Sequence, residues 1–148
     1  MKKKSFGLQQ VLNYRQEIEK ERSLEFAAAR HALTRAADLL QEEEESARQL
    51  ARELTAKQNE GISSDELRLY ADFSRHQHQE LQRQRQTVEQ LGRKADEKQE
   101  QLLEAAKEKK VLETYRDKTL QRQRKQLAQR EQELLDEIAL QQAGGGKP

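Results

Sequence analysis

The chain has 148 residues, and its 28 Lys and Arg against 27 Asp and Glu leave a net charge of +1, so self-repulsion does not favour disorder. Leu, Ile, Val and Phe together make up about a fifth of the chain, which is too little for an ordinary globular core. Cysteine is absent, which excludes disulfides and thiolate metal sites. Ala, Glu, Lys, Leu and Arg account for more than half of the residues, as is typical of long helices and coiled coils.

The first predicted element is a helix over about residues 6–59, preceded by a short basic arm at residues 1–7. No apolar run follows this arm, so we do not interpret it as a signal peptide, and the longest apolar run, residues 26–29, is too short to span a membrane. Spacings of three and four residues along the helix indicate a coiled-coil seam that charged residues interrupt, which predicts modest rather than tight packing. The predicted seam positions are Leu8, Val11, Arg15, Ile18, Arg22, Glu25, Ala29, Ala32, Ala36, Leu40, Glu43, Ala47, Leu50 and Leu54.

A turn is predicted at residues 60–63, which is the only credible break between Leu8 and Leu140. Gly61 suits the left-handed backbone conformation that commonly follows the end of a helix. Ser63, followed three residues later by Glu66, forms the capping-box pattern of a helix start. So short a connection makes the two flanking helices antiparallel.

The second helix is predicted over about residues 64–141, followed by a flexible tail at residues 142–148. Its predicted seam positions are Leu67, Tyr70, Ser74, Gln77, Leu81, Gln84, Val88, Leu91, Ala95, Lys98, Leu102, Ala105, Lys109 and Leu112. If residue i faces residue 122 − i, the second helix continues about 26 residues beyond the first, and its leucines from residue 115 onward have no partner. We therefore predict a single all-α domain over residues 1–148, a long antiparallel two-helix coiled-coil hairpin with unequal helices.

The residues from 116 to 130 carry a local surplus of positive charge, with six cations against Asp117. Such a stretch is usually a solvated helix face, and its functional alternative is contact with an acidic partner surface. Nucleic acid is disfavoured because no aromatic residues alternate with the cations. His76 and His78 point away from each other on a helix, His31 is isolated, and no phosphate loop is present. We therefore predict a protein without enzymatic activity, cofactor or metal.

Three stretches resemble signatures of one family. Residues 6–15, FGLQQVLNYR, are similar to the F-x-L-Q-x-V-L-x-x-R opening of FliJ proteins, which are components of the bacterial flagellar type III export apparatus. Residues 61–73, GISSDELRLYADF, resemble the central G-[IM]-[ST]…Y-x-x-F segment of that family. Residues 110–118, KVLETYRDK, are similar to its late K-x-x-E-x-x-x-x-K signature, and the resemblance extends over nearly the whole chain.

The resemblance implies an antiparallel coiled coil like the stalk of the rotary ATPase gamma subunit, placed in the hexameric export ATPase and reaching the cytoplasmic ring of the export gate. It also implies a general chaperone that handles empty export chaperones, in the cytoplasm and at the inner membrane only through the apparatus. Tyr70 and Phe73 match the family's aromatic pair near the turn, and we expect them to contact the gate. By analogy with the stalk, the expected ATPase contacts are Leu8, Val11, Leu12, Arg15, Leu120, Arg122, Arg124, Lys125 and Leu127.

Three alternatives stay open at this point. The first is the equivalent stalk of a virulence injectisome, although the opening motif favours the flagellar apparatus. The second is a generic structural tether or dimerising coiled coil. The third is a helical nucleic-acid binder, which salt dependence would distinguish because phosphate contacts weaken steeply with salt whereas apolar docking does not.

Overall fold

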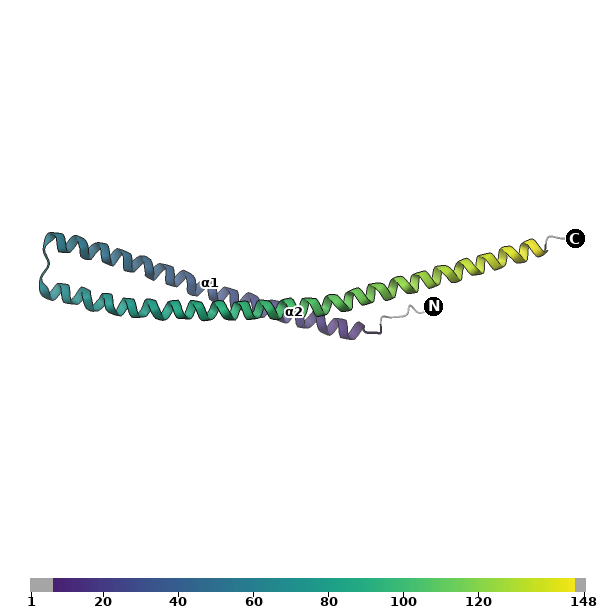
Figure 1. The fold of residues 1–148 in the computed structure, drawn as a ribbon, viewed down its shortest axis with the longest axis horizontal. Coiled ribbons are helices and arrows are strands. Elements are labelled where there is room, and N and C mark those ends of the chain that lie inside the picture. Colours follow the sequence, from purple (N-terminus) through teal and green to yellow (C-terminus); the bar gives the residue numbers. More distant parts are fainter. Residues whose placement is uncertain (1–6, 146–148) are drawn as a thin grey trace. The chain divides into compact units, whose positions relative to one another are not determined.

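The computed structural model describes residues 7–145 and contains two helices, α1 (Gln9–Glu60) and α2 (Ser64–Gly145), joined by a short turn (Figure 1). The helices pack antiparallel, which confirms the predicted all-α hairpin with a shorter first helix. The contacts of the chain gather in two units. Unit 1 consists of Met1–Lys20 and Glu104–Pro148, and unit 2 of Glu21–Leu103, so each unit holds a part of both helices.

The turn between the helices occupies residues 61–63. Gly61 has a φ of 102°, in the left-handed region that side chains with a Cβ rarely adopt. Ser63 caps α2, because its Oγ accepts a hydrogen bond of 3.1 Å from the Glu66 N–H and its carbonyl oxygen accepts one of 3.0 Å from the Leu67 N–H. Asp65 and Glu66 in the first turn of α2 also face the positive end of the helix dipole. The chain reversal is therefore encoded by local backbone chemistry.

We expect Gly61→Ala to lower the free energy of unfolding by about 1 kcal/mol, because alanine at a positive φ is strained. Steric crowding does not contribute, since nothing lies within 4 Å of the position that a Cβ would take. Thermal unfolding followed by circular dichroism measures the change. Gly61→Asn is the matched control and should cost less, because asparagine tolerates the left-handed region; equal losses for the two variants would contradict the backbone explanation.

The helix bounds differ slightly from those expected. α1 begins at Gln9 rather than near residue 6, and Gly7 and Leu8 form a turn before it. Glycine resists helix formation because it loses more conformational freedom than other residues, and the first helical hydrogen bond runs from the Leu12 N–H to the Leu8 carbonyl oxygen at 2.9 Å. α2 continues past the predicted end near residue 141 to Gly145, and it includes Gly144 and Gly145 although glycine is a poor helix former. Most of the basic arm and the last three residues of the predicted tail lie outside the described residues, and the single-domain organisation stays a prediction.

Unit 2 packs small and polar side chains along its seam. Ala29, Leu81 and Ala95 are buried there, and so is the amide side chain of Gln84. Leu33 lies against Gly92, since a Cβ on Gly92 would stand 4.0 Å from Leu33 Cδ1. The predicted register placed residue 89 opposite Leu33, so the partner lies three positions further along α2 than expected.

Unit 1 is organised around Leu12, whose side chain has no exposed surface. Among the residues of this unit whose burial is described, Ala105 is the other buried apolar one. Leu8 and Val11, the predicted seam positions here, are instead 41% and 42% exposed, and the buried side of α1 is therefore rotated toward Leu12. This rotation corrects the predicted phase of the seam at the beginning of the helix.

Ion pairs cross between the helices where the seam is not apolar. In unit 1, Arg15 pairs with Glu108, and Lys109 Nζ lies 2.8 Å from Glu19 Oε2. In unit 2, Glu25 accepts hydrogen bonds from Arg22 on its own helix and from Lys98 on the other, and these cations hold the pKa of its carboxyl below the usual value. Such half-exposed pairs add little net stability but disfavour registers that bring like charges together.

Candidate functional site

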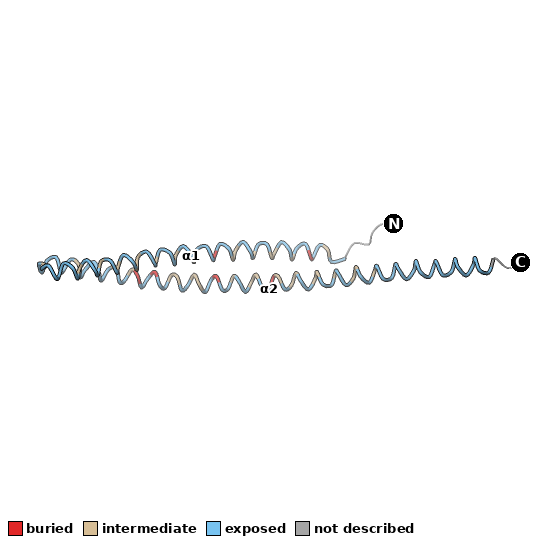
Figure 2. The backbone as a smooth tube through the Cα atoms, turned by 90° about the horizontal axis from the view of Figure 1, so that it is seen from above, coloured by how far each residue is buried: buried red, intermediate tan, exposed pale blue. Residues whose placement is uncertain are grey.

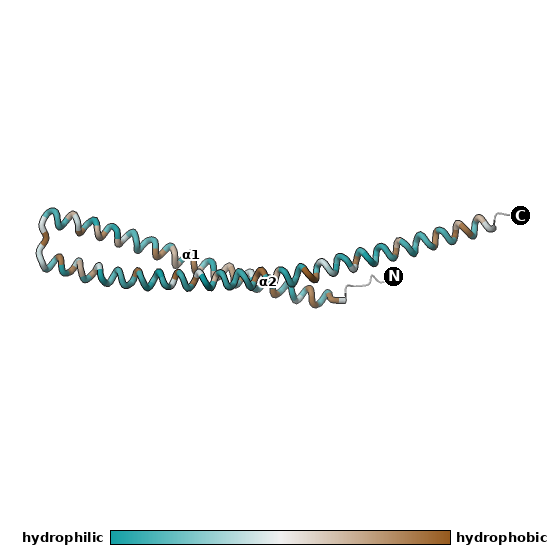
Figure 3. Tube along the Cα trace, viewed as in Figure 1, coloured by the Kyte–Doolittle hydropathy of each residue, from teal (hydrophilic) through white to brown (hydrophobic). Residues whose placement is uncertain are grey.

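The most exposed part of unit 1 is the segment of residues 124–144, which we call the overhang. Every residue of the overhang is exposed, and Figure 2 shows the C-terminal stretch of α2 as an unbroken exposed surface. Figure 3 shows apolar positions recurring along the same stretch between hydrophilic ones. A helix with a regular apolar pattern and no helix against it is a typical docking element.

The apolar residues of the overhang lie largely on one face. Leu127, Leu134 and Ile138 are spaced by seven and four residues, which places them in one line along a helix, and they are 55%, 58% and 42% exposed. Glu131 lies between them on the same face, and Leu135 borders it. We call Leu127, Glu131, Leu134 and Ile138 the stripe. Three apolar side chains at this spacing match the anchors by which a helix docks on an apolar groove.

Charge is sorted along the overhang. Residues 124–130 carry only cations among their charged side chains, and residues 131–144 carry only carboxylates. The cations are Arg124, Lys125 and Arg130, with Arg122 just before them, and the carboxylates are Glu131, Glu133, Asp136 and Glu137. Asp136 accepts a hydrogen bond of 3.0 Å from Gln132, which also lies in the acidic stretch. The predicted basic region is therefore followed directly by an acidic one.

The part of α2 that lacks a helix against it starts later than the sequence predicted. Arg116, Thr119 and Leu120 are half-buried, as is Gln123, whereas residues from 115 onward were expected to be free of contacts. The register explains the difference, because each residue of α1 meets a position further along α2 than the predicted register gives. Leu120 is thus partly engaged within unit 1, and Leu127 is the first stripe leucine that is open to a partner.

The other predicted ATPase contacts lie just before α1, in its first turns, and at the cations of α2. Leu8 and Val11 are accessible, and Arg15 is half-buried in its pair with Glu108. Leu12 is fully buried and in this conformation packs within unit 1. Arg122, Arg124 and Lys125 are exposed. The cations and Leu127 are thus accessible to a partner, whereas Leu12 is not.

The two predicted gate contacts lie near the turn, in unit 2, and have different environments. Tyr70 is half-buried, and Lys57 Nζ stands 5.5 Å from the centre of its ring. The interaction with Tyr70 is the main reason that the pKa of Lys57 is raised. Phe73 is 56% exposed, and its neighbour Leu69 is 71% exposed. Phe73 is therefore the more accessible aromatic anchor of the pair.

A model of the flagellar FliJ protein family matches residues 4–147. The chain belongs to the FliJ family. No curated protein and no solved structure matches the chain. Membership makes this FliJ-family chain a non-enzymatic component of the flagellar export apparatus, and it agrees with the motifs at residues 6–15 and 61–73. Phe6 of the first motif lies outside the described residues.

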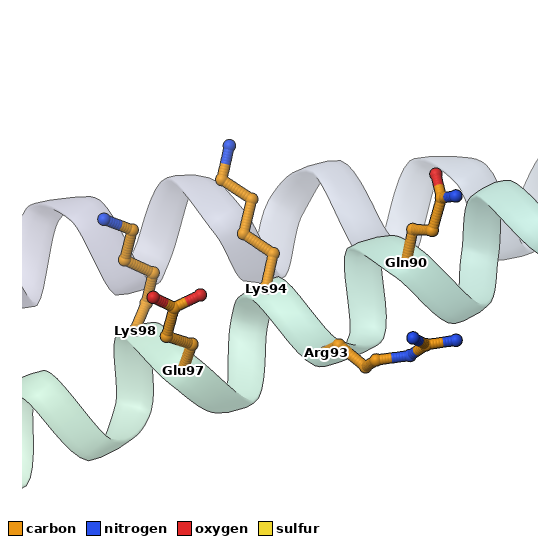
Figure 4. A pocket seen from close by; sticks show the side chains of 5 residues that line it. All are labelled: Gln90, Arg93, Lys94, Glu97 and Lys98. Carbon is orange, nitrogen blue, oxygen red and sulfur yellow. The ribbon is translucent and has the colours of Figure 1, made fainter.

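The surface hollows of this FliJ-family chain include open ones lined mostly by charged and polar side chains. One of them lies along α2 in unit 2 and is lined by Gln90, Arg93, Lys94, Glu97 and Lys98 (Figure 4). Arg93 pairs there with Glu89 at 2.9 Å and points away from Lys94, so the side chains do not converge on one point. Over residues 7–145, no group of three or more His, Cys, Asp and Glu side chains is placed to hold a metal ion, and neither helix is long and apolar enough to cross a membrane.

Proposed function

We propose that the chain is a stalk and chaperone of the flagellar export apparatus that inserts into the hexameric export ATPase and stimulates it. The observation that carries the proposal is the overhang, in which Leu127, Leu134 and Ile138 form an exposed apolar line on a helix that no other described segment covers. A two-helix coil narrow enough to enter a ring pore resembles the gamma-subunit stalk of rotary ATPases, and this analogy supports the placement.

The leucines and the cations have different tasks in the ATPase contact. Each leucine contributes roughly 1.5–3 kcal/mol when a partner buries it fully, so Leu127 and Leu134 set how long the complex lasts. Arg122, Arg124 and Lys125 attract acidic walls over a distance, so they raise the association rate and lose influence as salt increases. Leu8, just before α1, and Val11 and Arg15 in its first turns are additional contacts.

A second contact, in unit 2, joins the chain to the cytoplasmic ring of the export gate. Phe73 is the main anchor of this contact, because the residue is more than half exposed. It also lies in the segment that resembles the family's central signature. Tyr70 contributes its outer edge and is held in place by Lys57. Through the two contacts the chain couples the ATPase to the gate.

Two further elements of the proposal rest on family membership alone. The chain receives empty export chaperones, and it acts in the cytoplasm, peripheral to the inner membrane through the apparatus. The match to the flagellar family favours this pathway over the injectisome alternative.

Photo-crosslinking in cells tests both contacts together. We expect a photoreactive amino acid at position 127 to capture the export ATPase, and one at position 73 to capture the gate, because these side chains are exposed in different units. Soft-agar motility shows whether each variant works, and mass spectrometry identifies the product.

Position 24 is the matched control, since Leu24 is 66% exposed on α1 and belongs to neither proposed contact. It should capture neither partner. Capture of the ATPase from position 73 and of the gate from position 127 would reverse the assignment, and capture of neither partner in motile cells would overturn it.

A further inference from the structure

We propose that the overhang also pairs with the overhang of a second copy of this chain, antiparallel and related by a two-fold axis. The stripe is an exposed apolar surface that a partner could bury, and the distribution of charge along the overhang indicates which partner is complementary to it. A basic stretch followed by an acidic one can complement itself when reversed, and here it brings Arg130 of each copy beside Glu137 of the other. The complementarity is a property of residues 124–144 and does not depend on the proposed ATPase contact.

The stripe fixes a register for this pairing. Leu127 and Leu134 occupy equivalent positions of a seven-residue repeat, and Glu131 and Ile138 occupy the other core position. In an antiparallel pair the two kinds of position face each other, so Leu127 packs on Ile138 of the second copy and Ile138 on its Leu127. Glu131 faces Leu134 in the layers between, and its carboxylate reaches the rim.

Both flanks of the stripe support the same register. Arg130 and Glu137 border one side, seven residues apart, and the two-fold axis places Arg130 of each copy beside Glu137 of the other. Ala128 and Leu135 border the opposite side, where the small side chain of each copy accommodates the large one of its mate. The outer face holds Lys125 and the hydrogen-bonded pair of Gln132 and Asp136, which the pairing leaves in water.

Parallel pairing of the same segments is excluded by charge. It would bring Glu131 against Glu131 in the seam and set the basic stretches of residues 124–130 side by side, and like charges at these distances repel. The antiparallel dimer has only a few apolar layers, and a carboxylate lies in its seam, so we expect a dissociation constant in the micromolar range rather than an obligate dimer. The dimer covers the stripe that the export ATPase needs, so self-pairing and ATPase binding exclude each other.

Analytical ultracentrifugation of the full chain tests the dimer. We expect a concentration-dependent monomer–dimer equilibrium that Arg130→Glu weakens about tenfold at low salt, because the symmetry turns two attractive pairs into two repulsive ones. The double variant with Glu137→Arg restores the opposite charges and should recover most of the affinity. Lys125→Glu is the matched control, with the same change of charge on the outer face, and should change the affinity less than about threefold.

Two more variants define the packing. Glu131→Leu should strengthen the dimer about tenfold, because it makes the stripe fully apolar. The chain has no cysteine, so disulfides can form only at introduced cysteines. Ala128→Cys and Leu135→Cys therefore show whether the two overhangs pair parallel or antiparallel. Under oxidation a mixture of the two proteins should form the mixed disulfide, whereas each protein alone should stay uncrosslinked.

A monomer up to millimolar concentration would overturn the proposal. So would a dimer that ignores both Arg130→Glu and Glu131→Leu, since its interface would then lie elsewhere, and crosslinking of Ala128→Cys protein with itself, which requires parallel chains. These outcomes leave the ATPase contact standing, because that contact is measured with the ATPase present and at concentrations where this chain is monomeric.

Discussion

Leu12→Ala is expected to destabilise unit 1 more than any other single truncation of an apolar side chain in the described residues. Leu12 is the one large side chain there without exposed surface, and removal of a fully buried leucine costs about 2–5 kcal/mol through lost burial and the cavity that it leaves. A pair of helices with so few buried apolar residues has little stability to lose. We therefore expect the first turns of α1 to separate from α2 while unit 2 stays folded.

Hydrogen exchange, measured amide by amide, is the suitable experiment, because it resolves the two units separately. Protection over residues 9–20 should fall in Leu12→Ala and stay unchanged near the turn. Val11→Ala is the matched control next to it, with a side chain 42% exposed. If the two variants lost protection equally, the buried side of α1 would not be centred on Leu12.

This pair of variants also probes the point at which the sequence is least informative. The hairpin was predictable because Gly61 and the Ser63 cap are local signals, and the antiparallel packing follows from the short turn. The rotation of the helices was also predictable along most of the seam, where the predicted positions are buried or half-buried, but not at the beginning of α1, where apolar residues occur as neighbours. Val11 with Leu12 fits a seam in two phases that differ by one residue, or about 100° of rotation. Only contacts from the other helix choose between them.

The register of α1 against α2 could not be predicted from the sequence either. Along a seam with many polar residues, a slip of a few positions changes the apolar area only slightly, so ion pairs between distant residues decide it. Glu25 with Lys98 and Glu44 with Arg85, at 3.4 and 3.3 Å, are such pairs. The register also affects the candidate site. It leaves Leu120 half-buried in unit 1, so the exposed apolar face begins at Leu127. The leucine repeat in the sequence indicates which residues could form a docking surface. The packing of α1 then determines which of these leucines remain exposed.

We expect Leu127→Ala combined with Leu134→Ala to weaken binding to the export ATPase about 100-fold. Two leucines at roughly 1.5 kcal/mol each amount to about 3 kcal/mol, and about 1.4 kcal/mol is a factor of ten. Stimulation of hydrolysis should fall in parallel when the proteins are compared at one low concentration. The melting temperature should barely change, because both side chains are more than half exposed in the free chain. Leu140→Ala is the control, since Leu140 is exposed but lies on the other side of the helix.

Salt distinguishes the role of the leucines from that of the cations. The leucine variant should release the ATPase faster at every ionic strength, since burial of apolar surface is not screened. Charge reversal at Arg122 and Arg124 should instead slow association at low salt and have little effect near 0.5 M, where screening shortens the reach of charges to roughly 4 Å. Deletion of residues 124–148 combines both losses and should abolish stimulation. Full stimulation by that truncated chain would show that the overhang is not the ATPase contact and would shift the assignment to Leu8, Val11 and Arg15 at the beginning of α1.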